Sequence, residues 1–451
     1  MLRKIFSAPL PALAIAVIIA ASAAAFAQTE SVIYSFKGGA DGAQPSGSLI
    51  ADRAGHLYGV TSSGGSGNYG TVFQLSLTAN GWKERVIHTF SSSDGAGPQG
   101  LVMDARGNLL GTTYFGGAYN NGGVVFELQR SSSGTWNEIV LHNFNFDGTT
   151  NFDGANPSSS LIIDPRGNLY GTTYFGGTGP CTYSGPGARA PKGPPPSGCG
   201  TVFEISPSSN GTWKETILYN FQGTTDGALP LSGLVFDRSR NLYGTTFEGG
   251  GGTNKNCGSY FAAGCGVVFS LTRDTSGTWT QNVLYTFQGQ NDGGNPSSTL
   301  VFDRTGSLFG TTQGAQAGYG GASTVFQLSP SSAGTWTENT LYNFPTQGFG
   351  GGVGPFSGVT FDSAGNLYGT TYYGSSTGSA AEPPKLPTGG TAYKLAPTGG
   401  TWTPSVLHFF TGTPDGFAPA YGNLFLWKGA LYGTTSGGGA SGVGTVFKVV
   451  P

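Results

Sequence analysis

The chain has 451 residues, of which 80 are glycine, and its charged residues make up only 10% of the sequence, with a net charge of −2 at pH 7. Aromatic residues reach 13%, which excludes a disordered chain because disordered chains contain few aromatics. The small negative charge argues against nucleic acid and anionic membrane surfaces as partners, since both attract basic proteins.

The first predicted element is a signal peptide at residues 1–27. Arg3 and Lys4 give it a positive start, an apolar run follows, and Ala25-Phe26-Ala27 has the small-x-small pattern of a cleavage site. No later stretch approaches the 18 or so apolar residues of a spanning helix. Residues 28–451 are therefore predicted to form one soluble domain, secreted or periplasmic in a bacterium, with no transmembrane segment.

A short motif, Asn-Leu-Tyr-Gly-Thr-Thr, recurs seven times in the rest of the chain. Its central glycines are Gly59, Gly111, Gly171, Gly244, Gly310, Gly369 and Gly433. Spacings of 52 to 73 residues indicate a tandem architecture, either a propeller or a solenoid. Each repeat contains four strand signals: an apolar strand ending in Asp, the repeated motif, a Gly-Thr-Val-Phe strand, and a strand that begins with Trp and ends in Phe.

The two ends of the chain decide between these architectures. Residues 31–36 (SVIYSF) match a fourth strand without the first three, and residues 444–450 (GTVFKVV) match a third strand without a fourth. Side by side they complete one blade, and a closed ring has no free sheet edge. The sequence predicts an all-β fold, a seven-bladed β-propeller of four-stranded blades closed by three C-terminal strands plus one N-terminal strand.

The loops after Gly-Thr-Thr and after the closing Phe are expected on one face, the long-loop face, where function usually lies. Two of them carry the cysteines, and export favours disulfides. Cys199 and Cys265 occupy equivalent positions and each has one upstream partner in its own loop, so we predict Cys181–Cys199 and Cys257–Cys265. A zinc site is the alternative, disfavoured by spacing and by the lack of a nearby histidine. No metal or cofactor is expected.

Paired aromatics at the tips of the second strands are candidate ligand-binding residues. The pairs are Tyr114-Phe115, Tyr174-Phe175 and Tyr372-Tyr373. One ring of each pair is expected to pack between blades, and the other is placed to stack on a sugar. The fourth copy reads Phe247-Glu248, which makes Glu248 a catalytic candidate, although a glycosidase requires two carboxylates.

An Asp-Gly dipeptide follows most fourth strands, and Asp226 and Asp292 are the candidates from this set. Asp-Gly typically caps a turn, while a ring of carboxylates around the channel mouth could instead bind Ca²⁺ or a polyhydroxylated ligand. His88, His142 and His408 stand where other repeats have Tyr, so we interpret them as structural. A triad or metal site would need several converging histidines.

The order of these motifs resembles the GloVer tandem-repeat family of exported bacterial proteins, and the resemblance covers nearly all of residues 28–451. The resemblance implies export and a surface or extracellular location, and it supplies no catalytic residue. Members often end in a sorting or anchoring segment, whereas this chain stops at Pro451 inside its last strand, which favours release.

The leading functional hypothesis is a secreted, non-enzymatic binding propeller. It would be a monomer that recognises a glycan or an extracellular protein through the long-loop face. One alternative is an extracellular carbohydrate-active enzyme, a hydrolase or lyase, that uses Glu248 with Asp226 or Asp292. A second alternative is a structural envelope protein.

Overall fold

The computed structural model describes residues 29–119, 121–145, 153–182, 197–251, 257, 262–314, 322–345, 354–374, 389–419 and 421–451. The predicted signal peptide lies outside these residues. Within them the chain forms 29 strands and one 3-10 turn, Gly39–Asp41. No helix among the described residues is long and apolar enough to span a membrane.

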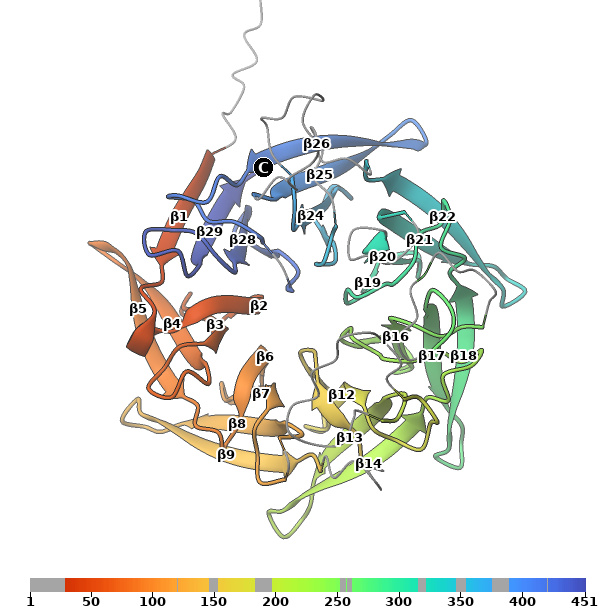
Figure 1. The fold of residues 1–451 in the computed structure, drawn as a ribbon, viewed down its shortest axis with the longest axis horizontal. Coiled ribbons are helices and arrows are strands. Elements are labelled where there is room, and N and C mark those ends of the chain that lie inside the picture. The colour runs from red at the N-terminus through yellow and green to blue at the C-terminus, as the bar shows by residue number, and fades with distance from the viewer. Residues whose placement is uncertain are drawn as a thin grey trace, which may run out of the picture.

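The strands form seven antiparallel sheets arranged in a ring (Figure 1), which confirms the predicted seven-bladed β-propeller. The blades, each from its innermost to its outermost strand, are as follows: blade I, β2 (Ala43–Ala51), β3 (Leu57–Ser63), β4 (Thr71–Thr78) and β5 (Gly81–Thr89); blade II, β6 (Ala96–Met103), β7 (Leu109–Phe115), β8 (Val124–Arg130) and β9 (Trp136–Asn143); blade III, β10 (Ala155–Pro157) and β11 (Ile162–Ile163), then β12 (Leu169–Phe175), β13 (Thr201–Pro207) and β14 (Trp213–Asn220); blade IV, β15 (Val235–Phe236), β16 (Leu242–Thr246), β17 (Val267–Arg273) and β18 (Trp279–Thr286); blade V, β19 (Val301–Phe302), β20 (Leu308–Thr312), β21 (Thr324–Pro330) and β22 (Trp336–Asn343); blade VI, β23 (Thr360–Phe361), β24 (Leu367–Thr371), β25 (Thr391–Thr398) and β26 (Thr401–Phe409); blade VII, β27 (Phe425–Trp427), β28 (Ala430–Thr435), β29 (Thr445–Val450) and β1 (Thr29–Ser35). In blade III, β10 and β11 both pair with β12.

The N-terminal strand closes the ring. β1 pairs with β29 in antiparallel register, from Thr29 opposite Val450 to Ser35 opposite Thr445. The backbone N–H of Phe36 extends the pairing by donating to the carbonyl of Gly444 at 3.1 Å. Figure 1 shows the two chain ends side by side, β1 in red and β29 in blue. The predicted three-plus-one closure is confirmed.

The repeated motif is explained by contacts inside each blade. At the central glycine of blade III, Gly171, a Cβ would lie 2.6 Å from Cζ of Phe203 and 2.9 Å from Cδ2 of Leu161. Only glycine therefore lets the aromatic ring of the third strand lie across the second strand. Two residues later, the Thr173 hydroxyl hydrogen-bonds the Thr201 hydroxyl at 2.7 Å, which ties the second strand to the start of the third.

The closing phenylalanines join each blade to the next. Phe221 of blade III packs edge-on against Phe269 of blade IV, with ring centroids 5.1 Å apart, and both side chains are fully buried. At the closure, Phe36 of blade VII makes the same contact with Phe73 of blade I at 5.1 Å. Burying a side chain of this size stabilises a fold by about 1.5–3 kcal/mol, so these contacts contribute strongly to the ring.

In blades I to VI an Asp follows the innermost strand and caps the turn, whereas the innermost strand of blade VII ends in Trp427. In blade III, Oδ1 of Asp164 accepts hydrogen bonds from the backbone N–H groups of Arg166 at 2.8 Å and Asn168 at 2.9 Å. The N–H of Gly167 donates to the Asp164 carbonyl at 3.0 Å. These bonds show that Asp164 caps the turn, a common role for Asp at the start of a tight turn.

Candidate functional site

Residues in or just before the innermost strands of all seven blades surround a central cavity of about 250 Å³. Its lining consists of hydroxyl, amide and aromatic side chains, together with Leu231 and three glycines. Among these lining residues, all of them described, none is charged. The polar and aromatic lining residues are Ser48, Gln99, Tyr114, Ser158, Ser159, Ser160, Ser232, Ser297, Ser298, Thr299, Gln313, Phe356, Ser357, Tyr421 and Asn423.

The cavity belongs to the long-loop face. Tyr114 and Gln313 follow the Gly-Thr-Thr of their second strands, and the serines lie in or just before the innermost strands. Because the strands of a blade alternate in direction, both sets of residues lie at the same end of the blades. Burial raises the pKa of the Tyr114 hydroxyl, which therefore remains a neutral hydrogen-bond donor at physiological pH.

Four rings from blades VI and VII form an aromatic cluster beside this cavity: Phe356, Tyr372, Tyr373 and Tyr421. The Phe356 centroid lies 5.1 Å from that of Tyr372 and 5.9 Å from that of Tyr421. Tyr372 and Tyr373 lie 4.6 Å apart. Tyr421 is 58% exposed, so the cluster offers a ring to solvent at the channel mouth.

The predicted aromatic pairs have different positions. Tyr114 lines the cavity, with Phe115 beside it and 42% exposed. Tyr174 is half-buried and packs, with the buried Phe175, in the core shared by blades III and IV. Tyr372 and Tyr373 belong to the aromatic cluster.

Phe356 and Tyr421 were not singled out from the sequence. Both stand just before an innermost strand, where other repeats carry Ser, Gln or Leu. An aromatic residue at this position was the signal that could have identified them.

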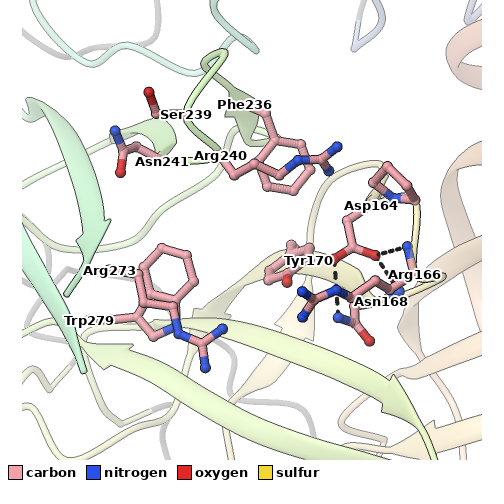
Figure 2. Close-up of a pocket in the computed structure, with 11 residues that line it drawn as sticks. Asp164, Arg166, Asn168, Tyr170, Phe236, Ser239, Arg240, Asn241, Arg273 and Trp279 are labelled. Carbon is pink, nitrogen blue, oxygen red and sulfur yellow. Dashed lines mark hydrogen bonds between the residues drawn. The ribbon is translucent and has the colours of Figure 1, made fainter. Parts of the chain in front are cut away.

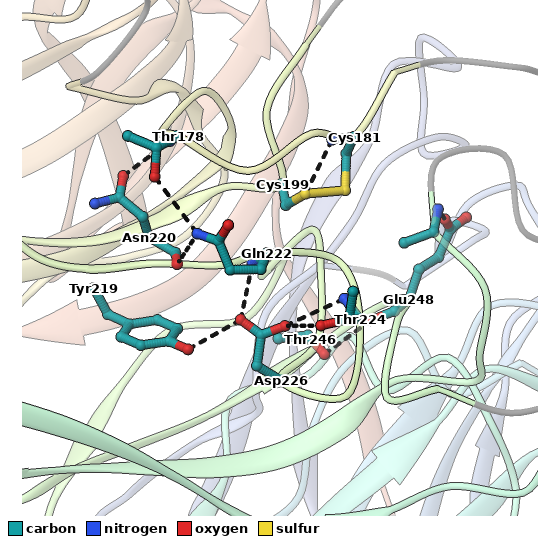
Figure 3. The surroundings of a disulfide bond; sticks show 11 residues. Thr178, Cys181, Cys199, Tyr219, Asn220, Gln222, Thr224, Asp226, Thr246 and Glu248 are labelled. Carbon is teal, nitrogen blue, oxygen red and sulfur yellow. Dashed lines mark hydrogen bonds between the residues drawn. A yellow bond between two sulfur atoms is a disulfide. The ribbon is translucent and has the colours of Figure 1, made fainter.

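Glu248 is buried and does not line the cavity. Its Oε2 atom accepts a hydrogen bond from the backbone N–H of Ala262 at 3.0 Å. Figure 3 shows its side chain near the Cys181–Cys199 bridge, pointing away from Asp226. The contact joins Glu248 to Ala262, and the catalytic role of Glu248 stays a prediction.

Asp226 and Asp292 both cap turns at the blade rim. Asp226 accepts hydrogen bonds from the Tyr219 hydroxyl at 3.0 Å and the N–H of Gln222 at 2.8 Å (Figure 3). Asp292 does the same with Tyr285 at 3.0 Å and Gln288 at 2.7 Å. Burial and the Asp226 charge raise the pKa of Tyr219, which lies on an outermost strand. The two carboxylates are therefore at the rim rather than around the channel mouth.

Both predicted disulfides are present. Cys181 pairs with Cys199 and Cys257 with Cys265, with Cα atoms 5.0 and 5.2 Å apart. All four cysteines of the chain are thereby paired. Cys199 and Cys265 stand just before the third strands of blades III and IV, at the end of the blades that carries the cavity.

A second cavity, of about 410 Å³, lies on the opposite face between blades III and IV (Figure 2). Two of its three aromatic rings are already covered, because the guanidinium of Arg240 lies over Phe236 at 5.7 Å and that of Arg273 over Trp279 at 5.7 Å. A similar cavity recurs between blades IV and V. This hollow follows from the repeat itself and is a weaker candidate than the central cavity.

These features define the protein as a closed seven-bladed propeller with an uncharged, hydroxyl-lined channel mouth. The chain belongs to the Gloeobacter/Verrucomicrobia repeat family, whose profile matches residues 22–261 and 192–382. This match confirms the family resemblance seen in the motifs.

Comparison with curated protein sequences gave no match. Among solved structures, the chain is similar to a gluconolactonase from Xanthomonas campestris, with 16% identity over 76% of this chain and 85% of that chain and a TM-score of 0.40. It is also similar to a Lactobacillus plantarum protein, with 14% identity over 82% of this chain and 86% of that chain and a TM-score of 0.47. A Trichoderma reesei carbohydrate-active enzyme of family AA12 is 13% identical over 94% of this chain and 96% of that chain, with a TM-score of 0.41. Similarities this distant transfer no activity to the present chain.

Proposed function

We propose that this protein is a secreted, non-enzymatic binding propeller that recognises a neutral glycan at the channel mouth of its long-loop face. One observation carries the proposal: an uncharged cavity rich in hydroxyl and amide groups lies beside exposed aromatic rings. A sugar presents hydroxyls around its edge and apolar C–H groups on its faces. Hydrogen-bonding side chains and an amphipathic Tyr ring match these two surfaces.

The absence of charge from the lining residues supports a neutral ligand. A charged group that enters a cavity without an opposite charge loses hydration and gains no ion pair. The lining offers serine hydroxyls and amides, which satisfy hydroxyl groups in both directions because they donate and accept. We therefore propose a neutral saccharide rather than a uronate or an amine.

The lining also supports binding over hydrolysis. Glycoside hydrolysis typically uses two carboxyl groups about 5–9.5 Å apart at the scissile bond. No Asp or Glu is among the described lining residues, and the Glu248 carboxylate accepts a backbone hydrogen bond within its own loop.

Two features of the chain support secretion, its disulfides and its N-terminal sequence. Two disulfides persist in oxidising compartments, and the apolar N-terminus is typical of a cleaved signal. Release of residues 28–451 as one monomeric domain belongs to the same proposal.

The test is a glycan array followed by titration of the best neutral oligosaccharide. Tyr421→Ala should weaken binding at least tenfold, since loss of one stacked ring removes about 1.4 kcal/mol or more. Tyr119→Ala is the matched control, because Tyr119 is similarly exposed at 54% on the same face and does not line the cavity. No binding to any neutral glycan, or equal losses in both variants, would contradict the proposal.

A further inference from the structure

The blade rims contain a recurring three-residue arrangement. A Tyr or His on the outermost strand of one blade faces the Asp of the following turn, and most neighbouring blades add a Glu two residues after their Trp. Where the first residue is Tyr, its hydroxyl reaches the Asp directly, as in Tyr34 to Asp41 at 2.7 Å. The Tyr219–Asp226 and Tyr285–Asp292 pairs, at 3.0 Å each, show the same direct bond.

Two of the histidines leave a gap at this position. Nε2 of His88 lies 3.6 Å from Oδ2 of Asp94, beyond hydrogen-bonding distance. Nε2 of His142 stops 3.6 Å from Oδ2 of Asp153 and 3.8 Å from Oε2 of Glu215. A ligand that binds both nitrogen and oxygen atoms would fit between the imidazole and the carboxylates.

The atoms around each gap are buried and lack partners. Nε2 of both histidines, Oε1 of Glu138 and Oε1 of Glu215 are buried without a hydrogen bond. A buried polar atom left in this state is unfavourable, so it requires an explanation. In each trio, His88–Asp94–Glu138 and His142–Asp153–Glu215, one ligand atom from every residue lies within 4.8 Å of the others.

We propose that each of these two trios binds one divalent transition-metal ion of the zinc class, the first between blades I and II and the second between blades II and III. Two ligand atoms on a tetrahedral Zn²⁺ ion, with bonds near 2.1 Å, lie about 3.4 Å apart. The two His–Asp separations of 3.6 Å and the His142–Glu215 separation of 3.8 Å need a small contraction to reach this value, and all ligand atoms of each trio lie within 4.8 Å of one another. An imidazole ligand favours zinc over Mg²⁺ or Ca²⁺, which prefer oxygen alone.

The first site is held in place by its surroundings. Oδ1 of Asp94 accepts the N–H of Ser91 at 2.7 Å, which leaves Oδ2 directed at His88. The His88 ring packs edge-on against Phe90 at 4.6 Å. The His88 and Asp94 side chains are 17% and 24% exposed, so an ion has a path from solvent. Three protein ligands leave one position for water.

His408 provides an internal comparison. Its Nε2 atom is only 2.8 Å from Oδ2 of Asp415, so this pair is closed by a hydrogen bond. Asp415 is further held by the N–H and hydroxyl of Thr411. No ion is expected at this rim position.

The experiment counts zinc bound to the purified protein after EDTA treatment and dialysis against Zn²⁺, by inductively coupled plasma mass spectrometry. We expect two equivalents per chain for the wild type, one for His88→Tyr or His142→Tyr, and none for the double variant. Tyr is the residue that other blades carry at this position, so these variants are expected to fold. His408→Tyr is the matched control and should retain two equivalents.

A second variant keeps the test decisive if a Tyr variant misfolds. Glu138→Gln removes one ligand oxygen with little change in shape and should weaken zinc binding at least tenfold at the first site. Zn²⁺ should also raise the melting temperature of the wild type and not that of the double variant. Fewer than two equivalents in the wild type, or the same stoichiometry in His88→Tyr and His408→Tyr, would overturn the proposal.

Discussion

Replacement of Phe36 by Ala tests ring closure quantitatively. Phe36 follows β1, is fully buried and packs edge-on against Phe73 of blade I. Truncation of a buried Phe to Ala typically costs about 3–5 kcal/mol, the sum of lost burial and the cavity left behind. Because Phe36 closes the ring, we expect a decrease of this size in the free energy of unfolding, measured by guanidinium denaturation of residues 28–451.

Two further variants serve as references for Phe36→Ala. Phe221→Ala removes the equivalent fully buried ring in the middle of the chain and should cost a similar amount. Ser31→Ala changes an exposed residue of β1 and should stay within about 0.5 kcal/mol of the wild type. If Phe36→Ala resembled Ser31→Ala while Phe221→Ala lost several kcal/mol, β1 would be a tail and the closure argument would be wrong.

Three other predictions concern charge, shape and the disulfides. Burial, with help from Asp41, raises the pKa of Glu84 to about 7, so its stabilising contribution is present below pH 4.5 and is lost as pH rises through about 7. Glu84→Gln should therefore gain about 1 kcal/mol relative to the wild type between pH 5 and 8, after allowance for its partial exposure, and a flat difference in denaturation experiments would refute this. Gly171→Ala should lose about 1–3 kcal/mol by overpacking against Phe203, and an unchanged melting curve would contradict the packing argument. Peptide mapping should find Cys181 joined to Cys199, whose reduction should lower stability by at most about 3 kcal/mol, and a Cys199–Cys265 link would contradict the structure.

The sequence predicts the fold well because each blade repeats the same local contacts. Gly171, Thr173 and the closing Phe221 each make one specific contact. The equivalent residues of other blades make the same contact around the ring. Closure was predictable because residues 31–36 match a fourth strand that lacks its first three, and residues 444–450 match a third strand that lacks its fourth. The disulfide pairing followed from equivalent positions in two loops.

The candidate site could be predicted only in part, because it depends on contacts between repeats. Tyr372 and Tyr373 were chosen from the second strand, but their neighbours Phe356 and Tyr421 come from other segments. The rim histidines looked structural because each was compared with its equivalents in other repeats. Their carboxylate neighbours, such as Glu138 beside His88, lie on the next blade, and spacing within a repeat cannot show that contact.

The most direct test of the proposed function is a crystal structure of residues 28–451 with the neutral oligosaccharide that binds best on the array. We predict the sugar in the central cavity, with one face against Tyr421 and its hydroxyls bonded to the serines of the channel mouth. A sugar bound instead between blades III and IV, beside Arg240 and Trp279, would contradict the assignment of the long-loop face as the binding face.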